Sequence, residues 1–181
     1  MINEHLPTML LKTFSRFRRK EIIIIILLAL TVGGLGLVLP GRLNVVVSDS
    51  LSHRIFLIFN VPARIETGDY LVFKYDNGHR FLDKFIVKSL SDHNMLTKQV
   101  GCAPGDVLTV DDNRKFSCNG KSLGQALKTD SSGNVLPLFV FNGVIPQGSY
   151  FMIGSNPRSF DSKYFGFVRK NEIFYKAYPI W

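Results

Sequence analysis

The sequence predicts a mainly β, antiparallel fold preceded by one N-terminal transmembrane helix, and two patterns carry that prediction. The first is a run of 19 residues without a charge, from Ile22 to Pro40. The second is a series of short β-rich stretches, separated by turn residues, that fills the chain after this run. The length of 181 residues suits one ordinary domain with an appendage.

The uncharged run is the predicted membrane span. As a helix it would extend roughly 28 Å, close to the hydrocarbon thickness of a bilayer. The alternative, a buried core helix, fits poorly because the five consecutive isoleucines 22–26 leave no polar face. The glycines in the run are also common in membrane spans.

Charge sets the predicted orientation of this span. Five basic residues precede it, so the positive-inside rule places the N-terminus in the cytoplasm. No A-x-A cleavage site follows, which favours an uncleaved anchor over a signal peptide. We therefore expect a cytoplasmic basic arm (1–21), a transmembrane anchor (22–40) and a periplasmic β-rich domain (41–181) of a single-pass protein in a bacterial inner membrane.

In the exported region, short β-rich runs broken by turn residues predict strands at intervals of 8–15 residues, which is typical of an antiparallel β fold. Only SLGQALK (122–128) resembles a helical turn. The expected strands are 54–59, 69–75, 81–90, 95–101, 106–110, 136–141, 150–154 and 172–178.

Composition and motifs exclude several classes of function. The net charge of +8 first suggests a nucleic-acid binder, but the 17 basic residues beyond the arm are scattered among 12 acidic ones. That pattern indicates a solvated surface facing anionic lipid, with no nucleic-acid partner. There is no GxGxxG, Walker or HExxH motif, and we expect neither a cofactor nor a metal.

Cys102 and Cys118 are the two cysteines of the chain. Their 16-residue separation is unlike the C-x-x-C pairs of a zinc site. Both lie in the exported region, where a disulfide between them can form; the alternative is two unrelated thiols.

Three polar segments stand out beyond the anchor: 47–51 (VSDSL), 98–106 (KQVGCAPGD) and 154–166 (GSNPRSFDSKYFG). Taken singly, each has a plain explanation as linker, solvated strand or loop. Taken together and in this order, they resemble the S-x-S-[ML], K-x5-P-G-D and G-x-N…S-x-D-S-[RK]-Y-x-G boxes of type I signal peptidases. The short last box and the SLSHRIFLI segment are most similar to the conjugative-transfer (TraF-type) branch.

The resemblance implies a signal-peptidase-like antiparallel β fold and a Ser-Lys dyad. Ser50 would be the nucleophile and Lys98 the general base, with Ser48 and the Ser50 N–H forming the oxyanion hole. The residues that would support them by orienting the amine and holding the last box in shape are Ser159, Asp161, Ser162 and Lys163. A lysine can serve as a base at neutral pH only if burial lowers its pKa.

Three departures from the family pattern matter. Ser52 and His53 occupy the stretch where proline is usual, so a looser turn is expected there. Ser155 replaces an acidic residue, and Lys163 replaces arginine, which removes the usual bidentate ion pair. We interpret these changes as a repacked box, because every implied catalytic residue is present.

The first hypothesis is a membrane-anchored serine endopeptidase that cleaves an exported precursor after small residues. In a conjugation system the substrate would be a pilin precursor, and cleavage could be coupled to pilin cyclisation. The expected partners are membrane lipid, the precursor protein and other conjugative-transfer components. The alternatives are a housekeeping signal peptidase and a non-catalytic scaffold of the transfer apparatus.

Overall fold

The computed structural model describes residues 19–38, 40–46, 49–75 and 95–181. The chain divides into two compact units, the first ending at Arg42 and the second comprising Leu43–Trp181. In the first unit, helix α2 (Arg19–Val38) is followed by the short 3-10 helix η1 (Pro40–Arg42). Among the described residues, no helix meets the length and apolarity required to cross a membrane. The span predicted over residues 22–40 therefore stays a prediction.

The second unit contains a seven-stranded sheet in which every neighbouring pair is antiparallel. The apolar side chains along a strand contribute in turn to two buried layers, one on each face of the sheet, since successive side chains point to opposite faces. Leu71 and Phe73 belong to one buried cluster and Val72 to the other. In spatial order the strands are β1 (Leu43–Val45), β2 (Ile55–Asn60), β11 (Ile173–Pro179), β3 (Tyr70–Lys74), β4 (Met95–Cys102), β9 (Ser149–Ile153) and β10 (Val168–Arg169).

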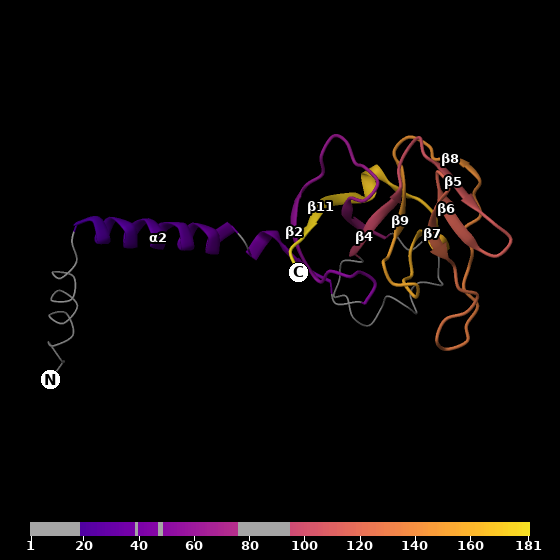
Figure 1. The fold of residues 1–181 in the computed structure, drawn as a ribbon, viewed down its shortest axis with the longest axis horizontal. Coiled ribbons are helices and arrows are strands. Elements are labelled where there is room, and N and C mark those ends of the chain that lie inside the picture. The colour runs from indigo at the N-terminus through magenta and orange to yellow at the C-terminus, as the bar shows by residue number, and fades with distance from the viewer. Residues whose placement is uncertain (1–18, 39, 47–48, 76–94) are drawn as a thin grey trace. The chain divides into compact units, whose positions relative to one another are not determined.

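A smaller, four-stranded antiparallel sheet forms one end of the same unit (Figure 1). A third buried cluster packs between the two sheets and includes Phe116 of β6 (Lys115–Cys118) stacked on Phe151 of β9, with ring centroids 5.3 Å apart. In spatial order the strands of the four-stranded sheet are β7 (Lys121–Gln125), β6 (Lys115–Cys118), β5 (Val107–Val110) and β8 (Gly143–Val144). Helices α4 (Ser162–Phe165) and η2 (Lys170–Glu172) complete the unit.

The antiparallel β prediction is confirmed, with two errors in the placement of elements. Residues 136–141 form no strand: Leu136, Leu138, Phe139 and Phe141 pack into the third cluster from an irregular segment. The segment 122–128, read as a helical turn, instead begins inside strand β7, where it pairs with β6. The strand predicted at 81–90 lies outside the described residues.

Candidate active site

Strand β4 places Lys98 in the interior of the seven-stranded sheet. It pairs with Leu71 of β3, and its side chain is 4% exposed. The Lys98 Nζ donates a hydrogen bond of 2.7 Å to the Ser159 Oγ, and Ser159 is equally buried. Burial lowers the pKa of Lys98 from 10.5 to about 8, because the apolar surroundings disfavour the ammonium form. Asp161 raises this pKa, and Lys163 lowers it further.

The segment after β9 is organised around Asp161, which is fully buried. Its carboxylate caps helix α4 by accepting the Lys163 N–H at 3.1 Å, and it accepts the Gly154 N–H at 3.0 Å. The same carboxylate forms a 2.6 Å ion pair with the Lys163 Nζ. Next to it, the Ser162 Oγ accepts the N–H of Met152 at 2.8 Å. These bonds fasten the last box to strand β9.

Gly154 brings Ser50 to the same place. A Cβ at position 154 would lie 2.6 Å from the Ser50 carbonyl oxygen and closer still to the Ser159 side chain. The N–H of Asn156 also donates to the Ser50 carbonyl, at 3.4 Å. Backbone and side chain can approach this closely only because residue 154 has no side chain. The structure therefore gathers the Ser50 segment, Ser159 and Lys98 around Gly154.

The turn that carries Ser50 is held without a proline. Leu51, directly after Ser50, is buried in an apolar cluster, and Asp49 forms an ion pair with Arg54 across the turn at 2.5 Å. The Ser52 Oγ lies 3.1 Å from the Nδ1 of His53. Ser48, the implied oxyanion-hole residue, lies outside the described residues.

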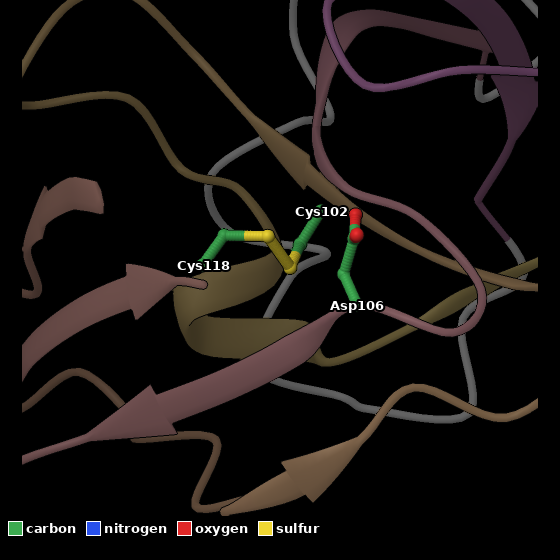
Figure 2. A group of neighbouring side chains, drawn as sticks. All are labelled: Cys102, Asp106 and Cys118. Atoms are coloured by element: carbon green, nitrogen blue, oxygen red, sulfur yellow. A yellow bond between two sulfur atoms is a disulfide. The ribbon is translucent and has the colours of Figure 1, made fainter. Parts of the chain in front are cut away.

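Cys102 and Cys118 are joined by a disulfide that links the end of β4 to the end of β6. Figure 2 shows the Asp106 side chain beside this bond. The three side chains lie close enough together to suggest a metal site, but sulfurs shared in a disulfide offer no thiolate ligand. With the disulfide formed, the carboxylate of Asp106 is the one metal ligand that these three residues provide.

Asp106 is instead the centre of a hydrogen-bond network. Its carboxylate accepts the Ala103 N–H at 2.9 Å, the Asn119 Nδ2 at 2.8 Å and the Thr67 hydroxyl at 3.1 Å. The bond from Ala103, the largest influence, holds the pKa of Asp106 below its usual range. The network joins the turn after β4 to both sheets.

Sequence reasoning missed three of these features: the close approach at Gly154, the ion pair across the Ser50 turn, and the role of Asp106. The glycine that begins the last box was a visible signal for the first, since a glycine in or directly after a strand often marks a close backbone approach. The opposite charges of Asp49 and Arg54 were a weaker signal. Nothing in the turn sequence APGD distinguishes a network centre from an ordinary turn residue.

Comparisons with known proteins place the chain in a family. A family model described as signal peptidase, peptidase S26, matches residues 18–181. The chain is similar to the conjugal transfer protein TraF of Agrobacterium fabrum (strain C58), with 26% identity over 154 residues, covering 81% of this chain and 85% of that protein. It is also similar to a signal peptidase I from Enterococcus faecalis V583, with 22% identity, a TM-score of 0.35, and coverage of 62% of this chain and 96% of that one. Because the family model spans nearly the whole sequence, the chain belongs to the signal peptidase family, peptidase S26.

Proposed function

We propose that this chain is a membrane-anchored serine endopeptidase in which Ser50 is the nucleophile and Lys98 is the general base. The family is one of serine peptidases. The observation that carries the proposal is the buried amine of Lys98, bonded to Ser159 at the glycine against which the Ser50 backbone packs. A desolvated lysine beside a serine is one way to activate a hydroxyl without histidine.

In the proposed reaction, neutral Lys98 takes the proton of the Ser50 hydroxyl as its oxygen attacks the scissile carbonyl. The tetrahedral intermediate collapses when the leaving amine receives that proton from Lys98, and an ester to Ser50 remains. Water then attacks the ester with Lys98 again as base. With a pKa of about 8, roughly a tenth of Lys98 is neutral at pH 7, against less than a thousandth for an ordinary lysine.

The neighbouring residues have supporting roles in this proposal. Ser48 and the Ser50 N–H would stabilise the oxyanion, a contribution of a few kcal/mol in comparable sites. Ser159 orients the Lys98 amine through its 2.7 Å hydrogen bond. The buried Asp161 and Ser162 hold the segment that carries Ser159 against β9.

The proposed substrate is an exported precursor cleaved after small residues. The similarity to a conjugal transfer protein favours a pilin precursor and an association with other transfer components. If the amino terminus of the pilin replaces water in attacking the ester, the product is a cyclic subunit. The compact chain, with about 50 residues between the lysine box and the last box, favours this specialised role over general secretion.

The proposed location is the bacterial inner membrane, with the N-terminus in the cytoplasm and the peptidase unit in the periplasm. Its support is the basic residues before the uncharged run and the apolar surface of α2, whose isoleucines 23–26 are exposed. The disulfide fits an oxidising compartment. Lipid would then be the immediate neighbour of residues 22–40.

The test is mass spectrometry of a candidate pilin precursor in vesicles with the full chain, its Ser50→Ala variant and its Lys98→Ala variant. We expect cleavage by the wild type and by the matched surface control Ser131→Ala, and none by the other two. A product lighter than the cleaved chain by one water indicates cyclisation. Cleavage by Ser50→Ala would contradict the proposal; rescue of a strain depleted of its general signal peptidase would indicate the housekeeping role.

A further inference from the structure

The proposed site buries three charged side chains where a single base would suffice. Lys98 is 4% exposed, Asp161 0% and Lys163 2%. A buried charge without a partner is costly, so each ionised group needs a counter-ion or loses its charge. One carboxylate can compensate one amine, and the geometry decides which.

The Asp161 carboxylate is occupied by Lys163. Its Oδ2 lies 2.6 Å from the Lys163 Nζ, and its Oδ1 accepts the Lys163 N–H at 3.1 Å. Lys98 instead donates to a hydroxyl, that of Ser159. Within the part of the chain that the structure describes, Lys98 forms no ion pair.

We infer that Lys163 is a positioning residue of the peptidase: it serves as the counter-ion of Asp161 and so allows Lys98 to be the neutral amine. The inference rests on the proposed function and extends it. With Lys163 charged and Lys98 neutral, the buried group has no net charge. Without the Lys163 cation, neutrality would require a charged Lys98, and an ammonium cannot accept the proton of Ser50.

The electrostatic influences on the pKa of Lys98 have the signs that this inference requires. After burial, the carboxylate of Asp161 raises its pKa and the cation of Lys163 lowers it. Among the described residues, Lys176 of β11 lies in the same row of the sheet, opposite Leu71, and forms its own 2.7 Å ion pair with Asp69, partly exposed to solvent. Their charges compensate each other, which leaves Asp161 and Lys163 to set the balance.

The experiment measures the acylation of Ser50 by a penem against pH, followed by mass spectrometry of the full chain, because this needs no known substrate. For Lys163→Met we expect the midpoint of the acid limb to rise by at least one pH unit, about a tenfold loss of neutral base at pH 7. For Lys163→Arg the cation remains and the midpoint should stay within half a unit of the wild type. The double variant Asp161→Asn/Lys163→Met removes both charges and should return the midpoint to near the wild-type value.

Two further variants keep the test decisive. Lys176→Met removes the cation of a similar lysine–aspartate pair two strands away, and the midpoint should not move. Asp161→Asn alone should lower the midpoint, which decides the matter if Lys163→Met does not fold by circular dichroism.

An unchanged midpoint for folded Lys163→Met, a double variant that titrates like Lys163→Met, or a raised midpoint for Asp161→Asn would each overturn the inference. If the penem still acylates Ser50→Ala at the wild-type rate, the proposed function fails instead. The two failures are therefore distinguishable.

Discussion

The two sheets of the second unit have the same antiparallel pairing but are held together by different interactions. The seven-stranded sheet buries charged and hydroxyl groups next to the middle of β4, where Lys98, Ser159 and Asp161 are all at most 4% exposed. The four-stranded sheet buries mainly apolar side chains and a disulfide, and its strand β7 is mostly exposed. Under the proposed function, the seven-stranded sheet carries an energetic cost that serves catalysis, and the four-stranded sheet provides support.

The first test of this difference between the sheets removes the buried charge of Lys98. Lys98→Met should abolish cleavage, a loss of at least about a thousandfold, since the proposed general base is missing. It should also stabilise the fold at pH 7. Lys98 has a lower pKa folded than unfolded, so unfolding takes up a proton, and the penalty of about 3 kcal/mol is present below pH 8 and fades as the pH rises toward 10.5.

Urea unfolding at pH 7 and pH 10.5 measures this effect, with Lys121→Met as the exposed control. The stabilisation should appear at pH 7 and shrink at pH 10.5. Equal effects at both pH values would show that Lys98 is not buried as an easily neutralised amine.

A second prediction concerns the close approach at Gly154. Gly154→Ala places a methyl group against the Ser50 carbonyl and the Ser159 side chain, so both must move. We expect cleavage to fall about a hundredfold, because small displacements of catalytic groups are costly, and stability to fall by about 1–3 kcal/mol. Gly41→Ala, which meets no atom within 4 Å, is the control. Kinetics at saturating precursor would contradict the prediction if Gly154→Ala kept wild-type turnover.

The sequence was informative where chemistry constrains spacing. The lysine strand, its Pro-Gly-Asp turn and the last box could be found because each combines unusual residues in a fixed order. The contact between Lys98 and Ser159 joins residues 61 positions apart and follows from the family pattern, not from any local rule.

Other features had no such signal. No strand was predicted at residues 43–45, yet they pair with β2 as strand β1. The segments 115–118 and 121–125 are short, polar and interrupted by turn residues, so their pairing depends on the packing of Phe116 beneath them. The apolar stretch 136–141 has the composition of a strand, but its side chains pack into the third cluster while its backbone joins neither sheet.

The disulfide tests how much the supporting sheet contributes. Replacing both Cys102 and Cys118 by serine removes the link between β4 and β6 and should lower stability by about 3 kcal/mol, mainly by freeing the unfolded chain. For a chain of this size that corresponds to roughly 6–12 °C in Tm. Scanning calorimetry of the wild type with and without a phosphine reductant should reproduce the shift. An unchanged Tm would mean that the apolar cluster alone holds the sheets together.

The smallest effect is expected at the ion pair across the Ser50 turn. Asp49 and Arg54 lie close, but both side chains are more than half exposed, where water and salt screen the attraction. Arg54→Met should therefore change stability by less than about 1 kcal/mol. Buried Leu51 would keep the turn in place, so acylation of Ser50 should change less than threefold. A tenfold slower acylation in high salt or in Arg54→Met would contradict this expectation. The exposed ion pair, and not the buried leucine, would then position Ser50, and surface interactions would matter to the site of the seven-stranded sheet as much as buried ones.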